Sequence, residues 1–124
     1  MDILEKVAAW LESRGIDCRV DRLEVAVGQV GLFPLGQEQL WRRCDVVGNT
    51  RRRVRYSFLL RTMAIPGADT AQWLLQLQTA AAEQPPALGE NQQFRAQQGK
   101  FVKAAGAGLA VYEVRLIAER EESL

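Results

Sequence analysis

The middle of the chain holds two extended runs, 38–47 and 50–61, separated by the dipeptide Gly48-Asn49. Such a dipeptide between two runs is typical of a two-residue β-hairpin turn, because both residues tolerate the positive φ angles that the turn requires. Setting Val47 opposite Thr50 determines the predicted register. The pattern therefore indicates a long antiparallel β-hairpin.

The predicted register divides this hairpin into two faces. It places Trp41 opposite Tyr56, on an apolar face near the base that also includes Phe58. Towards the turn the same face becomes charged, with Asp45 opposite Arg52 and Arg43 opposite Val54. The other face carries Arg42, Cys44, Arg51, Arg53 and Arg55. A hairpin end that is charged on both sides cannot be buried in its own domain, so we expect it to project.

Charge is concentrated in this hairpin. Residues 42–61 carry seven arginines against the single acidic residue Asp45, a balance of +6, whereas the whole chain of 124 residues carries +1. The candidate residues for a subunit interface or a DNA path are Arg42, Arg43, Arg51, Arg52, Arg53 and Arg55.

Three interpretations of these arginines are open. The first is a solvated hairpin with cross-strand pairs such as Asp45–Arg52. The second is a contact between subunits, because the planar guanidinium suits carboxylates across an interface. The third is binding to a phosphate backbone, although no recognition helix, aromatic stacking strip or lysine-rich tail accompanies the arginines. Because we expect this end of the hairpin to lie outside the core, replacing Arg51, Arg52 and Arg53 with serine should damage assembly and leave the fold intact.

Two amphipathic helices are expected. In residues 2–14 the apolar side chains Ile3, Val7, Trp10 and Leu11 recur with helical period; Asp2 is the expected N-cap and Gly15 the left-handed C-terminal cap. The second helix covers 69–83, with Asp69 or Thr70 as cap. Its stripe consists of Trp73, Leu74, Leu77, Ala80 and Ala81, and Pro85-Pro86 ends it.

The remaining segments predict strands. They cover 17–22, 23–33, 93–104 and 109–120, with Pro34 and Gly36 marking a bend or a sheet edge. In the last strand Tyr112, Val114, Leu116 and Ala118 should point inward, and the acidic residues after Arg120 should fray. We expect one α+β domain over 1–124, an antiparallel or mixed sheet with a long projecting hairpin and two helices packed on it.

Catalytic chemistry is not expected. The chain contains no histidine, which removes the commonest general base and metal ligand. Cys18 and Cys44 are too few for a disulfide framework or a four-cysteine zinc site and are most simply reduced thiols, with a single bridge as the alternative. Gly106-x-Gly108 lacks the remaining residues of a phosphate-binding loop. We therefore expect a protein that is not an enzyme and has no metal and no cofactor.

Membrane association is not expected either. The N-terminus lacks the basic and apolar regions of a signal peptide. The longest nearly uncharged run, 104–112, is far shorter than the roughly 20 residues of a spanning helix.

Three segments resemble a known family. The turn Asp45-Val46-Val47-Gly48-Asn49-Thr50 is followed by the strand Arg53-Val54-Arg55-Tyr56-Ser57-Phe58-Leu59-Leu60-Arg61, and the chain closes on Tyr112-Glu113-Val114-Arg115-Leu116-Ile117-Ala118. In this order, they resemble the minor capsid or tail-completion proteins of tailed bacteriophages and prophages of Gram-positive bacteria, which are related in architecture to tail terminators. The resemblance covers residues 1–119. The chain departs from the family before the hairpin. Members of the family often have more glycine- and proline-rich extended sequence there, whereas in this chain only Pro34 and Gly36 appear.

The resemblance implies a structural virion protein. Such a subunit is assembled in the cytoplasm of the bacterial host and caps the tail at its head-proximal end as a homo-oligomeric ring, often a hexamer. Its implied partners are copies of itself, tail-tube proteins and head–tail connector proteins, with non-specific DNA contact if the arginines line the DNA path. The alternative from a different class is a small nucleic-acid-binding module that uses the arginine-rich hairpin.

Overall fold

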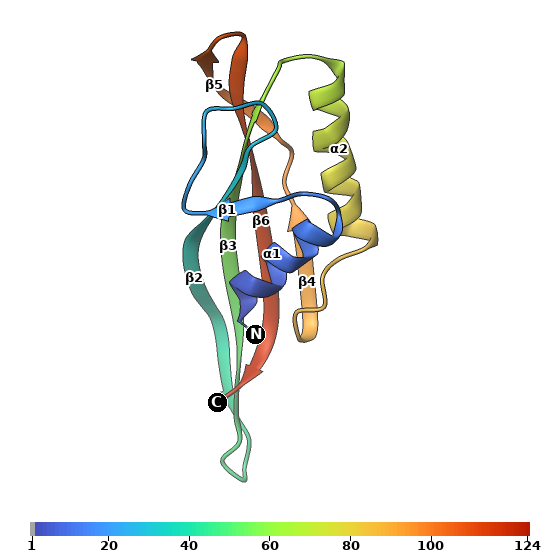
Figure 1. The fold of residues 1–124 in the computed structure, drawn as a ribbon. Helices are drawn as coiled ribbons and strands as arrows, with labels where there is room; N and C mark the ends of the chain where they lie inside the picture. Colours follow the sequence, from blue (N-terminus) through green and yellow to red (C-terminus); the bar gives the residue numbers. More distant parts are fainter. Residues whose placement is uncertain (1) are drawn as a thin grey trace.

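Two helices and six strands make up the computed structural model, which describes residues 2–124 (Figure 1). In chain order they are α1 (Ile3–Ser13), β1 (Cys18–Val20), β2 (Val30–Cys44), β3 (Thr50–Ala64), α2 (Ala68–Glu83), β4 (Glu90–Ala96), β5 (Lys100–Gly106) and β6 (Leu109–Ser123). The α+β class is confirmed.

The six strands form one mixed sheet with β3 in the middle. β3 pairs with β2 on one side and with β6 on the other, over almost its whole length. β1 is parallel to β2, and all other pairs are antiparallel. The outer side of β6 is covered in two parts, by β5 near its start and by β4 near its end. The expected strand 93–104 is therefore two strands, separated by residues 97–99.

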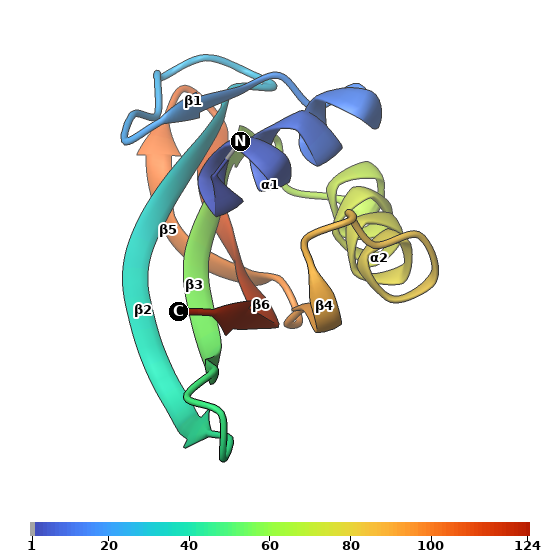
Figure 2. The same cartoon turned by 90° about the horizontal axis from the view of Figure 1, so that it is seen from below.

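Both helices cover the same face of this sheet, as predicted (Figure 2). Val7 and Leu11 of α1 and Leu77 of α2 are buried against β3 and β6 residues whose side chains alternate towards the helices. Phe58 is only 2% exposed and belongs to this core. We call this side of the sheet the helix face and the opposite side the open face.

The helix ends follow local backbone chemistry. The Asp2 side chain accepts a hydrogen bond from the Glu5 N–H at 2.8 Å, and Gly15 is left-handed with φ of +80°, so both predicted features of α1 are confirmed. The predicted cap of α2 is wrong. Gly67, which has no side chain to accept a hydrogen bond, occupies the cap position, and the Thr70 hydroxyl donates to the Ile65 carbonyl at 2.6 Å.

The N-terminal strands differ from expectation. β1 has three residues, and 21–29 form a loop where the second strand should begin. β2 then runs without a break through Pro34 and Gly36, which produce a β-bulge. Pro34 does lie at a sheet edge, as predicted, because β1 covers only residues 30–32 of β2.

The predicted hairpin register is wrong. Cys44 lies opposite Thr50, and residues 45–49 form a five-residue loop. This displaces β2 by three residues relative to β3. Because neighbouring side chains point to opposite faces, this odd displacement exchanges the faces of residues 41–44, up to the β-bulge between Gln39 and Trp41.

The consequence is a different distribution of side chains. Trp41 lies opposite Arg53, on the face opposite Tyr56 and Phe58. It is half-buried outside the core, beneath the Arg43 guanidinium, whose central carbon lies 4.5 Å from the ring centroid. Arg42 lies opposite Arg52, so it no longer shares a face with Arg51 and Arg53.

Candidate interaction surface

The four β3 candidates lie inside the sheet and not on a free arm. Arg51, Arg52, Arg53 and Arg55 belong to the central strand, with β2 on one side and β6 on the other. β6 continues to Ser123, so the segment after Arg120, predicted to fray, is ordered β-strand beside the arginines. Only the loop 45–49 and the adjoining strand ends extend beyond β6 (Figure 1).

On the open face, Glu119 of β6 binds two of these arginines. Its carboxylate accepts hydrogen bonds from Nε of Arg53 at 3.1 Å and from Nε of Arg55 at 3.2 Å. The Glu119 side chain is 8% exposed and that of Arg53 is 14% exposed. Burial raises the pKa of Glu119, but the hydrogen bonds from Arg53 and Arg55 outweigh it and hold the pKa below its usual value. We call these three residues the Glu119 cluster.

On the helix face, Glu122 is the acceptor of a second group. It accepts hydrogen bonds from Arg52 at 2.9 Å, from Arg120 at 3.0 Å and from the Tyr56 hydroxyl. Burial opposes ionisation of Glu122, but hydrogen bonds from Tyr56, Arg120 and Arg52 lower its pKa overall. The pKa of Tyr56 is raised, by burial and by the neighbouring carboxylate. We call these four residues the Glu122 cluster.

Ion pairing removes most of the positive charge that the sequence concentrates here. Arg51 pairs with Glu90 and Glu121, Arg55 pairs with Glu38 as well as Glu119, and Arg61 pairs with Glu113. Every arginine of β3 therefore has a carboxylate partner. Of the six candidates, only Arg42 and Arg43 have no ion pair within residues 2–124.

The expected Asp45–Arg52 pair is not formed, because Asp45 organises the loop instead. Its Oδ1 accepts hydrogen bonds from the N–H groups of Val47 at 3.0 Å and Asn49 at 2.9 Å, and its Oδ2 accepts from the Asn49 side chain. The bond from the Asn49 N–H is the main cause that lowers the pKa of Asp45. Gly48, with φ of +90°, supplies the left-handed residue that the loop requires.

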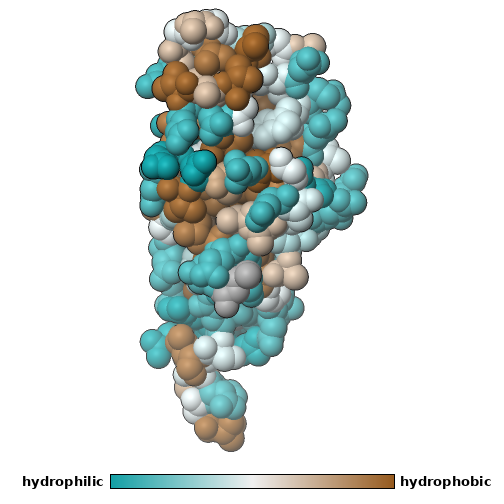
Figure 3. All heavy atoms as spheres, viewed as in Figure 1, coloured by the Kyte–Doolittle hydropathy of each residue, from teal (hydrophilic) through white to brown (hydrophobic). Residues whose placement is uncertain are grey.

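This loop presents two valines to solvent. Val46 is fully exposed and Val47 is 77% exposed. We call residues 45–49 the tip. At the opposite end of the molecule, Val25, Val27, Ile65 and Phe101 are also exposed, so apolar atoms appear at both ends of the surface (Figure 3).

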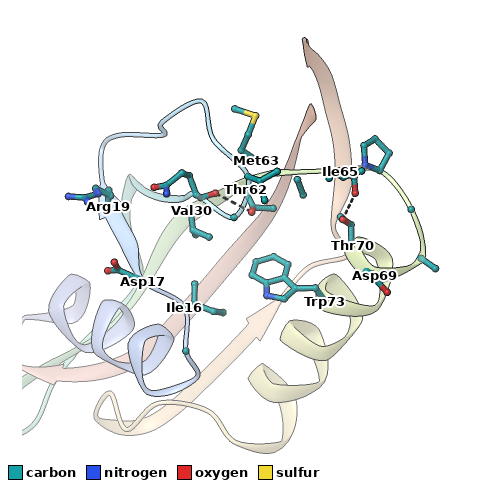
Figure 4. Close-up of a pocket in the computed structure, with 18 residues that line it drawn as sticks. Ile16, Asp17, Arg19, Val30, Thr62, Met63, Ile65, Asp69, Thr70 and Trp73 are labelled. Carbon is teal, nitrogen blue, oxygen red and sulfur yellow. Dashed lines mark hydrogen bonds between the residues drawn. The ribbon is translucent and has the colours of Figure 1, made fainter. Parts of the chain in front are cut away.

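A cavity of about 700 Å³ lies at that opposite end, and we call it the α2 pocket (Figure 4). Its walls are β1, the loop that follows, the end of β3 and the first turns of α2. Trp73 points into it, and Val27, Met63 and Ile65 add apolar surface. Asp17, Arg19 and Asp69 lie at its walls and have no ion pair within the described residues.

The other chemical features are simple. Cys18 and Cys44 are free thiols, and burial raises the pKa of Cys18. Gly106 ends β5, and Ala107 and Gly108 connect it to β6. In the described part of the chain no three histidine, cysteine, aspartate or glutamate residues are arranged to hold a metal ion. Neither helix among residues 2–124 has the length and apolarity needed to cross a bilayer.

Sequence reasoning missed the acidic partners, the tip valines and the pocket. One signal was available for the first of these, because Glu119, Glu121 and Glu122 lie in a segment that continues an apolar strand pattern, with Glu119 and Glu121 on one face and Glu122 on the other. No known family model and no curated protein sequence matches the chain.

Proposed function

We propose that this protein is a structural subunit that assembles with copies of itself. In the form that the sequence resemblance implies, it completes or caps the tail of a bacteriophage or prophage virion at the head-proximal end, as a ring. Tail-tube and head–tail connector proteins are the proposed neighbours, and the virion is the proposed location.

The observation that carries the proposal is the position of the exposed apolar residues. Val46 and Val47 stand at the tip, while Val27 and Ile65 stand at the other end beside a cavity. Exposed apolar groups that gather at distinct places are typical of protein–protein contact sites. Two such places at opposite ends of one chain suit repeated contacts between copies.

The arrangement of the arginines supports assembly over nucleic-acid binding. Binding to a phosphate backbone depends on protein cations that neutralise phosphates and so release the counterions of the nucleic acid. The arginines of β3 already have glutamate partners. The alternative, a small nucleic-acid-binding module, therefore depends on Arg42 and Arg43. A subunit that works through its shape needs no catalytic residue, in keeping with a chain that lacks histidine.

Light scattering coupled to size-exclusion chromatography separates the two functions. We expect the molar mass to rise with concentration to a discrete oligomer, at low and at raised salt, and duplex DNA to elute separately. A monomer that retains duplex DNA with a steep salt dependence would refute the structural proposal. A discrete ring that ignores DNA would eliminate the alternative.

A further inference from the structure

We propose that the tip of one subunit inserts Val46 and Val47 into the α2 pocket of a second copy of this chain. The inference rests on the proposed function and specifies its contact. It assigns one surface as the inserted element and another as its receptor, so that each subunit uses both.

The tip is organised before any partner binds. The Asp45 carboxylate accepts three hydrogen bonds from Val47 and Asn49, and the Asp45 N–H donates to the Asn49 carbonyl at 2.9 Å. These bonds hold the loop in one conformation while both valines stay exposed. A loop that is already ordered loses little conformational entropy on binding, which favours its use as an inserted element.

The α2 pocket has the size and the lining for an apolar occupant. Its volume of about 700 Å³ falls in the range of roughly 300–1,000 Å³ that is usual for ligand sites in proteins. The side chains of Trp73, Val27 and Ile65 provide the apolar surface that two valines require. Val27 and Ile65 are themselves exposed, so an occupant would cover apolar area on both partners.

Charge favours the same pairing. Arg42 and Arg43, at the end of β2 next to the tip, are the candidate arginines without an ion pair in residues 2–124. The pocket walls carry two unpaired carboxylates, Asp17 and Asp69, against one unpaired cation, Arg19. A basic element therefore approaches a receptor with a net negative charge, which favours encounter in this orientation.

The two surfaces cannot meet within one subunit. β3 starts next to the tip and ends at the pocket wall, and its 15 residues span about 50 Å at roughly 3.4 Å per residue (Figure 1). The contact must therefore join different copies head to tail. Contacts of this kind close into a ring when the rotation between subunits permits, and otherwise continue as a filament.

The experiment uses variants that each lose one side of the contact. The tip variant is Val46→Ser/Val47→Ser, and the pocket variant is Val27→Asp/Ile65→Asp. All four side chains are exposed, so the fold should tolerate these changes. Val25→Asp is the matched control in the same loop as Val27 but outside the pocket lining, and Leu75→Ser is the control for loss of an exposed apolar side chain.

Sedimentation velocity over a concentration series gives the readout. We expect the wild-type chain and both controls to associate, and each double variant alone to remain monomeric. An equimolar mixture of the two variants should form only a dimer of twice the chain mass, because one functional tip and one functional pocket remain. Circular dichroism checks that every variant is folded.

The outcomes separate this inference from the proposed function. If the wild-type chain assembles and the double variants assemble equally well, tip insertion is refuted while self-assembly stands. If the mixture stays monomeric or forms larger species, head-to-tail pairing through these surfaces is refuted. A wild-type chain that remains monomeric at millimolar concentration refutes the insertion, and retention of DNA by that monomer refutes the structural function as well.

Discussion

Glu119 of β6 lies directly opposite Arg55 of β3, and its carboxylate accepts a hydrogen bond from the Arg55 Nε at 3.2 Å. The other carboxylate oxygen accepts from Arg53, two residues along the same strand. A shift of one residue between the strands would move Glu119 to the helix face, away from both arginines. The Glu119 cluster therefore helps to set the register of the two central strands.

Replacing Glu119 with alanine should destabilise the fold. Arg53, with a side chain only 14% exposed, and Arg55 would lose the acceptor they share. Removing one partner from a buried pair costs roughly 3–5 kcal/mol, and the partial exposure of Arg55 lowers our expectation to about 2–4 kcal/mol. Urea unfolding measures the loss. Glu90→Ala, at the exposed pair with Arg51, is the control and should cost much less, because water screens this pair; equal losses would contradict the assignment.

Stability should fall in acid because of the Glu119 cluster and the Glu122 cluster. The pKa values of Glu119 and Glu122 are lowered in the folded protein, so the unfolded chain binds more protons than the folded one as the pH drops. The stabilisation is complete above the ordinary glutamate pKa of about 4.3 and is lost as the pH falls through the lower folded-state values. Urea midpoints measured from pH 7 to pH 3 test this. The decline should be shallower in Glu119→Gln/Glu122→Gln, and an identical slope would refute the role of these carboxylates.

Phe58→Ala should cost about 3–5 kcal/mol in the free energy of unfolding, because the ring is buried in the core beneath the helices. Phe101→Ala provides the comparison, because Phe101 is 56% exposed and makes one edge-to-face contact with Tyr112. We expect it to cost less than about 1.5 kcal/mol. Chemical denaturation of both variants is sufficient, and similar costs would place Phe58 outside the core.

The arginines should separate into two groups in stability measurements. Arg52→Ser/Arg53→Ser removes a donor from each cluster and should cost about 2–4 kcal/mol. Arg42→Ser/Arg43→Ser breaks no ion pair within the described residues and removes only the exposed stacking of Arg43 on Trp41, so it should cost less than about 1 kcal/mol. The structure thus revises the sequence-based expectation that serine at Arg51, Arg52 and Arg53 leaves the fold intact. Equal thermal midpoints for the two double variants would contradict this division.

Asp45→Ala should loosen the tip without unfolding the sheet. It removes the acceptor for the N–H groups of Val47 and Asn49. Hydrogen exchange at these two amides should accelerate at least tenfold, while exchange at Leu60 in the core strand stays unchanged. Slow exchange at the tip of the variant would show that the carboxylate is not what orders the loop.

The local pattern of the sequence was sufficient for the helices and most of the core. Periodicity identified the buried faces of both helices, and alternation placed Val114 and Leu116 inward, because each pattern extends over several residues and depends on neighbours in the chain. The hairpin register was different. The dipeptide Gly48-Asn49 predicts a two-residue turn. The Asp45 carboxylate instead accepts hydrogen bonds from Val47 and Asn49, which stabilise a loop of five residues.

The sequence alone determined a small α+β chain with a basic central hairpin, because composition and periodicity are local properties. Only the tertiary structure decided what that charge does. Charges compensate through space, and the glutamates that neutralise the arginines of β3 lie up to about 70 residues away in the sequence. Their pairing turns an expected interaction surface into part of the fold's own stability. It leaves Arg42 and Arg43, at the end of β2 next to the exposed valines of the tip, as the candidate arginines without an ion pair in residues 2–124.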